Sequence, residues 1–349
     1  MNISTALFDA LPIPSDQKLF LIDVGARWGT NPPWNQLDQK YINYLGFEPD
    51  EAECASLIEK YKTSSVDYIP IGLSDSVTDH ILYLTREPGC SSIFPPNMSF
   101  MSKLYFAERW DIQKEIPIKT VPLAQILDER GVVPDALKID VQGAALNVLR
   151  GVGKHLDSIL LVDVEVEFSA MYQGQALFGE VDQLLRKHGF ELLDINKYYA
   201  RRKILELKYS SRGQVIFADV LYVRSVENFY SVKMSIDERR TKLWNLIIML
   251  SLYGHFDLAI EFAQHKQSAF TENEQLNIAS VIKKYTAIPA WKLLLFNNKL
   301  MEKIGYALSL FGNSLQIQSR LFGWGSDQSA VGSRYKYYFN GRITRFFRK

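Results

Sequence analysis

Three buried strands set the main constraint on the fold of this 349-residue chain. The run KLFLIDV (18–24) is continuously apolar from Leu19 to Ile22 and then reaches Asp23; ALKIDV (136–141) and SILLVDVEVEF (158–168) are also mostly apolar, with acids from Asp140 and Asp163 onward. Such runs are typical of strands that are covered on both faces, as in a parallel sheet with helices on both sides. The rest of the chain must therefore supply the covering helices.

Helices and further strands alternate between these runs. The pattern predicts helices at 31–44, 51–61, 121–129, 144–150 and 178–188, and strands around Phe47 and at 66–73, 190–195 and 215–224, with 79–85 as an added edge strand. Residues 86–118, rich in proline, glycine and serine, predict an irregular loop and a short aromatic helix. The alternation indicates an α/β fold with a seven-stranded, mostly parallel sheet.

From residue 235 onward the pattern is helical only. Apolar residues keep helical spacing on both sides of Gly254, which predicts a helical hairpin. We therefore divide the chain into a lead-in (1–17), a sheet domain (18–225) and an all-α C-terminal region (226–349), with the boundary near 226–236.

The composition excludes several protein classes. Only Cys54 and Cys90 are present, too few for a cysteine-rich zinc site, and this suggests a reducing compartment. The N-terminus lacks a charged start and a long apolar run, so no signal peptide is expected. The longest apolar stretch, 246–253, is far shorter than the roughly 20 residues that span a bilayer. We therefore expect a soluble, cytoplasmic protein.

A charge asymmetry lies behind the formal net charge of +1. Residues 299–349 hold nine Lys and Arg and two acids, which leaves the remainder of the chain acidic. This basic, aromatic tail could lie on an anionic membrane surface, which would place the protein at the periphery of the inner membrane surface. A solvated end or a partner-binding helix is the alternative.

Two clusters at the ends of the first two strands point to an adenosine-containing ligand. Asp23, Gly25 and Gly29 form the pattern D-x-G-x-x-x-G. Glycine lets a ligand approach the backbone, and a carboxylate accepts hydrogen bonds from an ammonium group. Glu48, 25 residues after Asp23, stands where an acid commonly binds ribose hydroxyls. The phosphate-binding pattern G-x-G-x-x-G is absent, so S-adenosylmethionine fits better than a dinucleotide. A plain tight turn and an exposed turn acid remain the alternatives.

Two groups of carboxylates end later strands. Asp140 follows the strand at 136–141, and Asp163, Glu165 and Glu167 share one face of the strand at 158–168. Carboxylates in such positions can act as a general base or hold a divalent ion. The alternative is that acids at every second position mark a solvated strand end, which we favour for Glu167.

The span from about Phe20 to Leu193 resembles the FkbM family of S-adenosylmethionine-dependent methyltransferases. The matching segments are FLIDVGARWG, GFEPDEAECASL, IGLSDS, GCSSIF and LKIDVQGAALNVLRG. The resemblance implies a class I methyltransferase (Rossmann-like) fold, with Asp23, Gly25 and Gly29 at the methionine part of the cofactor and Glu48 at the ribose. The cofactor-binding residues are then Asp23, Gly25, Ala26, Gly29, Glu48, Pro49, Ser74 and Asp75.

The sequence also departs from the family pattern. Gln142 and Ala145 replace acidic residues of the pattern K-I-D-V-E-G-A-E, and Arg27 stands where asparagine is common. Asp140 and Glu165 remain as catalytic candidates, and a divalent metal, whose use stays open, would bind to the same two carboxylates.

These features predict an S-adenosylmethionine-dependent O-methyltransferase that methylates a hydroxyl group of a glycan, a glycolipid or a secondary metabolite. A second hypothesis keeps the fold without the catalysis: a degenerate domain that binds the cofactor or serves assembly, with the helical part as its docking element. We expect a small-molecule or glycan acceptor and no nucleic acid, because the basic residues lie in the tail.

Overall fold

A computed structural model describes residues 3–61, 65–207, 209, 211 and 213–287. Contacts divide the chain into two compact units, one of residues 1–204 with 213–286 and one of residues 205–212 with 287–349. The first unit contains every helix and strand described below. The predicted basic tail lies outside the described residues.

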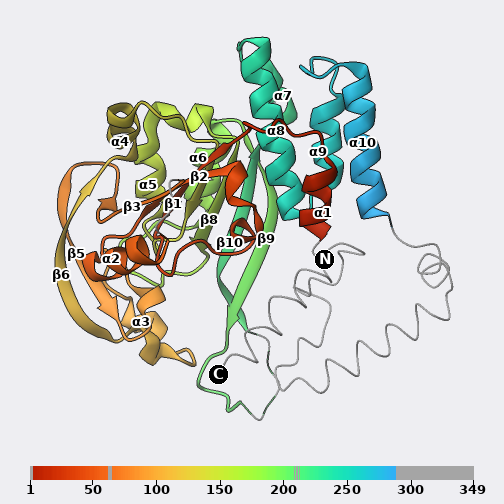
Figure 1. The fold of residues 1–349 in the computed structure, drawn as a ribbon. Coiled ribbons are helices and arrows are strands. Elements are labelled where there is room, and N and C mark those ends of the chain that lie inside the picture. The colour runs from red at the N-terminus through yellow and green to blue at the C-terminus, as the bar shows by residue number, and fades with distance from the viewer. Residues whose placement is uncertain (1–2, 62–64, 208, 210, 212, 288–349) are drawn as a thin grey trace. The chain divides into compact units, whose positions relative to one another are not determined.

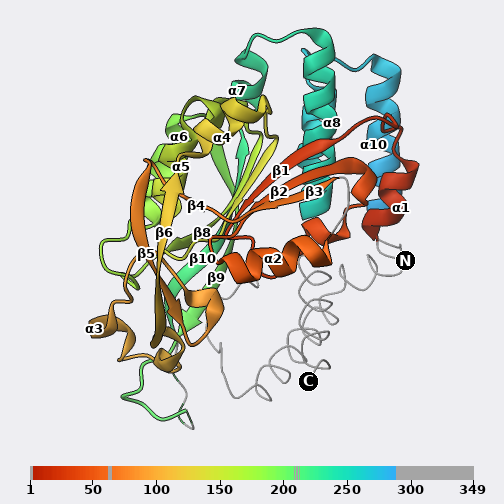
Figure 2. The same ribbon diagram turned by 60° about the vertical axis from the view of Figure 1, so that its left-hand side comes forward.

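A seven-stranded sheet forms the centre of the first unit, in the order β3-β2-β1-β7-β8-β10-β9 (Figures 1 and 2). The strands are β1 (Leu19–Val24), β2 (Ile42–Phe47), β3 (Val66–Ile69), β7 (Ala136–Ile139), β8 (Leu161–Glu167), β9 (Phe190–Ala200) and β10 (Gln214–Arg224). Among these strands, β10 is antiparallel to both of its neighbours, β8 and β9, and every other neighbouring pair is parallel. This arrangement is that of the class I methyltransferase fold, so the predicted fold class is confirmed. The strand order reverses between β1 and β7, which is where ligands bind in open α/β sheets.

Three helices cover one face of this sheet. They are α4 (Leu123–Arg130), α5 (Ala145–Val152) and α6 (Phe178–Lys187), each close to its predicted range. Their buried residues share a cluster with alternate residues of the central strands, such as Val24 and Ile139. α4 ends at Gly131, whose φ of +63° lies in the left-handed region that glycine adopts without strain.

The opposite face is covered by helices from both ends of the chain. These are α1 (Ile3–Ala10), α2 (Glu51–Lys60), α7 (Val226–Ser231), α8 (Ile236–Tyr253), α9 (Phe256–Gln264) and α10 (Glu272–Thr286). Figures 1 and 2 show α1, α8 and α10 side by side. Ser235 caps the start of α8 by accepting a hydrogen bond from the amide of Glu238, and Gly254 ends it, as the predicted hairpin requires.

α8 and the sheet share one hydrophobic core. Leu21 of β1 and Leu246 of α8 are both fully buried in the same cluster, together with residues of α1, α9 and α10. The predicted boundary near 226–236 therefore separates segments that bury their apolar side chains against each other. None of the described helices is long and apolar enough to cross a membrane.

The predicted helix at 31–44 is wrong. The chain forms only two short 3-10 turns, Trp34–Gln36 and Gln39–Tyr41, before β2 begins at Ile42. The Asp38 side chain accepts a hydrogen bond from the Lys40 amide and starts the second turn, which interrupts any continuous helix. The prediction rested on Asn31 as a helix N-cap followed by Pro32 and Pro33; the segment instead places Trp34 and Tyr41 in the core.

A second, three-stranded sheet contains part of the predicted strand 66–73 and the predicted edge strand 79–85. Its order is β4 (Gly72–Leu73), β6 (Ile112–Val121) and β5 (Thr78–Thr85). The predicted strand 66–73 is thus split between the two sheets, and 79–85 is not an edge strand of the main sheet. β6 was missed because most of its side chains are exposed and Pro117 interrupts the run. Between β5 and β6 lie a turn at Pro88–Cys90, α3 (Met98–Met101) and a turn at Ala107–Trp110.

The shared core predicts a single unfolding transition. Leu246→Ala should lower the free energy of unfolding by about 2–5 kcal/mol, because it leaves a cavity between α8 and the sheet. The exposed Leu276→Ala serves as the control and should change it by less than about 0.5 kcal/mol. Denaturant titration followed by circular dichroism measures both, and a second transition that Leu246→Ala leaves unchanged would contradict a shared core.

Candidate functional site

A buried ion pair joins β1 and β7 at the point where the strand order reverses. Nζ of Lys138 lies 3.0 Å from Oδ1 of Asp23, and the Tyr44 hydroxyl donates to Oδ2 at 2.8 Å. Asp23 is fully buried. Both its oxygens thus have partners in the protein, and Asp23 does not line the pocket described below.

The turn after β1 passes directly over the end of β7. Gly25 has a φ of +82°, and a Cβ atom at this position would lie 1.9 Å from the carbonyl oxygen of Asp140. The amides of Gly25 and Ala26 both donate to the carbonyl of Phe47 at 3.0 Å. Only glycine fits here, because the backbone conformation and the space both exclude a side chain.

A pocket opens at the carboxyl ends of β1, β2 and β7. Its walls come from these strand ends, from the second sheet and from the loop that follows β5. The lining includes Gly25, Arg27, Trp28, Glu48, Pro49, Gly72, Gly89, Ser91, Ser92, Thr120, Asp140 and Gln142. The predicted cofactor residues Gly25, Glu48 and Pro49 and the predicted catalytic residue Asp140 are therefore brought together.

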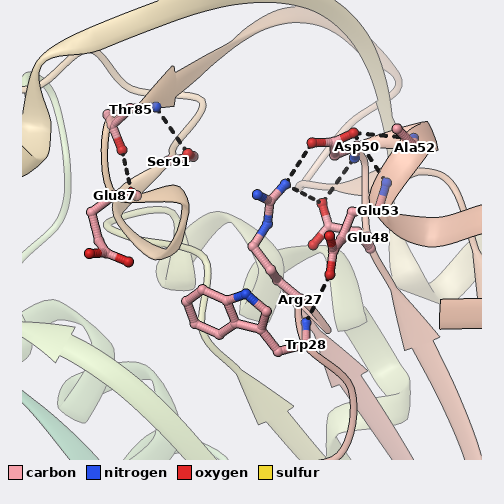
Figure 3. Close-up of polar contacts among 9 residues, drawn as sticks. All are labelled: Arg27, Trp28, Glu48, Asp50, Ala52, Glu53, Thr85, Glu87 and Ser91. Atoms are coloured by element: carbon pink, nitrogen blue, oxygen red, sulfur yellow. Dashed lines mark hydrogen bonds and ion pairs between the residues drawn. The ribbon is translucent and has the colours of Figure 1, made fainter. Parts of the chain in front are cut away.

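Glu48 keeps one carboxylate oxygen for a ligand. Its Oε1 accepts from the amide of Asp50 at 2.9 Å and lies 3.5 Å from the guanidinium of Arg27, which bonds to Asp50 at 2.8 Å (Figure 3). Within the described residues, Oε2 has no hydrogen-bond partner. Burial raises the pKa of Glu48, and Arg27 offsets this rise in part. A ligand with hydroxyl groups could donate to Oε2.

Trp28 forms part of the pocket wall. Figure 3 shows its indole directed away from the acidic residues that surround Arg27. A Cβ atom on Gly89 would lie 2.5 Å from the ring, so the loop after β5 contacts the indole closely. Trp28 as a whole residue is 53% exposed. Trp34 is buried against Tyr253, with ring centroids 5.7 Å apart, and belongs to the core instead.

Asp140 and Glu165 are linked by a side-chain amide. Nε2 of Gln142 donates to Oδ1 of Asp140 at 3.0 Å and to Oε1 of Glu165 at 2.5 Å. Glu165 is buried behind the pocket, whereas Asp140 lines it. The two predicted catalytic carboxyls therefore meet at one point, and Asp140 is the one that a bound molecule can reach.

Carboxyl groups continue along this face of β8 and β10. Burial, with the charges of Asp140 and Glu167, raises the pKa of Glu165 well above its ordinary value. Burial and Asp140 raise the pKa of Glu167 to about 8, and burial and Asp163 raise that of Asp219 to about 7. The interpretation of Glu167 as a solvated strand end is wrong, since the residue is 2% exposed.

Other predicted cofactor residues lie outside the pocket wall. Ser74 and Asp75 follow β4, where the Ser74 carbonyl packs against Gly151 of α5. Ala26 is buried, and Gly29 turns the chain beneath the ring of Tyr61. Among the pocket residues, Gly72 and Thr120 were missed, because the split of the third strand and β6 were missed.

The carboxyls do not form a ready metal site. Among the residues that the structure describes, no group of three or more His, Cys, Asp and Glu side chains is placed to hold an ion. Lys138 lies next to Asp140 and Asp163 and adds its own positive charge to this cluster.

Comparison with known proteins identifies the domain. Residues 23–192 match the family model described as a methyltransferase FkbM domain. A protein of Beauveria bassiana (strain ARSEF 2860) called Methyltransferase 1 is 27% identical over 204 residues, which are 52% of this chain and 76% of the fungal one. The predicted resemblance is thus confirmed, and residues 23–192 belong to the FkbM methyltransferase family.

Solved structures of methyltransferases also match. The FkbM methyltransferase of Methylobacillus flagellatus KT is 12% identical with a TM-score of 0.32, over 63% of this chain and 48% of that one. A magnesium protoporphyrin IX methyltransferase of Synechocystis PCC 6803, solved with bound SAM, is 10% identical with a TM-score of 0.32, over 64% and 78%. This chain therefore spans about half the length of the Methylobacillus protein. The class I methyltransferase fold is therefore assigned from the order and direction of the strands in the seven-stranded sheet.

The close contact between Gly25 and the carbonyl of Asp140 predicts that position 25 tolerates no side chain. Gly25→Ala should lower the free energy of unfolding by at least about 1–3 kcal/mol from backbone strain alone, and the clash with the carbonyl adds to this. Gly179→Ala in α6, where a Cβ meets nothing within 4 Å, should be neutral or stabilising by about 0.5–1 kcal/mol. Urea unfolding compares them, and equal stabilities would contradict the close approach.

The buried Glu167 predicts a dependence of stability on pH. In the unfolded chain this carboxyl loses its proton near pH 4–5, whereas the folded protein keeps it until about pH 8. Stability should therefore fall by up to about 1.4 kcal/mol per pH unit between these values. Glu167→Gln should remove this part of the slope, as urea unfolding from pH 4 to 9 would measure. An unchanged slope would show that Glu167 is ionised in the folded state.

Proposed function

We propose that this chain, in which residues 23–192 form an FkbM methyltransferase domain, transfers a methyl group from S-adenosylmethionine to a hydroxyl group. The acceptor class that we propose is a glycan, a glycolipid or a secondary metabolite. The observation that carries the proposal is the position of Asp140, a carboxylate that lines the pocket at the switch point of the sheet.

The pocket fits the adenosine end of the cofactor. Oε2 of Glu48 is available to the ribose hydroxyls, and Gly25 leaves the backbone open to close approach. Pro49 and Gly72 add to the wall beside them. Because the ammonium of Lys138 and the Tyr44 hydroxyl already bind Asp23, we assign it to the support of the β1 turn rather than to contact with the cofactor.

Asp140 is the proposed general base. S-adenosylmethionine supplies an electrophilic methyl group. An alcohol has a pKa far above 7, so its oxygen becomes a good nucleophile only when a neighbouring group accepts the proton. The Asp140 carboxylate lines the pocket and can accept that proton, whereas Glu165 does not line the pocket and burial raises its pKa well above its ordinary value. Trp28 lines the same pocket and offers an apolar surface on which the acceptor can stack.

A degenerate, non-catalytic domain is the second candidate. Its support is the contact of Gln142 with both carboxyls, which places an amide where the family pattern has an acid. In that case the helices α8–α10 would serve assembly. Isothermal titration with S-adenosylhomocysteine, followed by transfer of labelled methyl groups to a panel of hydroxylated acceptors, separates the two. Binding without transfer to any acceptor favours the degenerate domain.

Substitution of the base tests the assignment. Asp140→Asn should lower turnover by at least about 100-fold, the usual contribution of a general base, and change cofactor affinity little. Asp128→Asn, at an exposed position on α4, is the matched control. Steady-state kinetics with labelled S-adenosylmethionine give both values. Undiminished turnover of Asp140→Asn would reject the role, and activity that survives exhaustive chelation would exclude a required metal held by Asp140 and Glu165.

A further inference from the structure

The amide of Gln142 stands between carboxyl groups of neighbouring strands. Asp140 follows β7 and Glu165 lies in β8, the parallel strand beside it. One nitrogen, Nε2, donates a hydrogen bond to each carboxyl. In other sites a divalent cation or a shared proton occupies the point between two such carboxyls.

The orientation of this amide is held from its other end. The Tyr172 hydroxyl lies 2.7 Å from Oε1 of Gln142, and Nε1 of Trp110 donates to that hydroxyl at 3.0 Å. Since the amide oxygen lies against this hydroxyl, the amide nitrogen is directed to the carboxyls, whose oxygens accept its two N–H groups. Tyr172 and Trp110 are themselves buried together in a small core.

The backbone is also constrained to place this side chain. Gln142 has a φ of +52°, which residues other than glycine rarely adopt. The Ser92 hydroxyl, from the loop after β5, donates to its carbonyl oxygen at 2.6 Å. Two separate segments therefore fix Gln142, and a strained conformation persists at the one residue whose side chain joins the carboxyls.

We infer that Gln142 is a positioning residue that takes the place of a cation, holding Asp140 beside Glu165 with two N–H groups. The inference deepens the proposed function and rests on it in one respect, namely that Asp140 is the base. An amide carries no charge and does not titrate, so it keeps Asp140 in place whether or not metal is present.

A single isosteric substitution, Gln142→Glu, should convert this group of side chains into a binding site for a divalent cation. Gln142→Glu puts a third carboxyl beside Asp140 and Glu165, and three oxygen ligands of this kind bind hard divalent cations. In titrations of the full chain with MnCl₂, followed by electron paramagnetic resonance, the variant should bind Mn²⁺ at least about tenfold more tightly than the wild type. Gln175→Glu adds the same charge near Tyr172, where the amide joins no carboxyls, and should bind like the wild type.

Equal Mn²⁺ binding by folded Gln142→Glu and the wild type would overturn the inference, as would equal gains for Gln142→Glu and Gln175→Glu. If Gln142→Glu does not fold, the double variant Gln142→Glu with Glu165→Gln decides, because it restores two carboxyls and one amide. Folding of the double variant without a gain in Mn²⁺ binding supports the inference, and its failure to fold overturns it. Mn²⁺ binding requires no acceptor, so absence of methyl transfer by the wild type would refute only the proposed function.

Discussion

The ion pair between Asp23 and Lys138 holds together the two strands on which the rest of the site depends. It joins β1 to β7 at the reversal of strand order, with Asp23 fully buried and the side chain of Lys138 12% exposed. Removing one partner of such a pair leaves a buried charge and commonly costs about 3–5 kcal/mol. Because the pair is satisfied internally, the turn at Gly25 can rest on the carbonyl of Asp140. The pocket forms above this contact.

The same region shows what the sequence could predict. Continuous apolar runs identified β1, β7 and β8, since strands buried on both faces have no other common sequence pattern. The acids at the ends of predicted strands led to Asp140, after β7, and Glu48, after β2, which the structure brings to one pocket. Local patterns were sufficient here because chain position alone determines which residues stand at the carboxyl ends of parallel strands.

Contacts between distant segments could not be predicted in this way. The spacing of Trp34, Leu37 and Tyr41 suits a helix, but these side chains enter the core from two short turns. Exposed β6 has no apolar pattern and is defined by its pairing with β5. Asp23 carried a cofactor signature, yet its partner is a lysine 115 residues away, which only the fold brings near. The role of Gln142 likewise depends on a tyrosine from another loop.

Because α8 is buried against the strands that hold the pocket, the C-terminal helices are not an independent accessory to the sheet. Where a sheet domain and its accessory helices are separate, helices can be exchanged between relatives without change to the catalytic part. Here Leu246 and its neighbours fill the same core as Leu21 of β1. A substitution in the C-terminal helices that changes the volume of this core therefore alters the packing of β1 as well. The helices outside residues 23–192 and the strands inside that span therefore fill one core together.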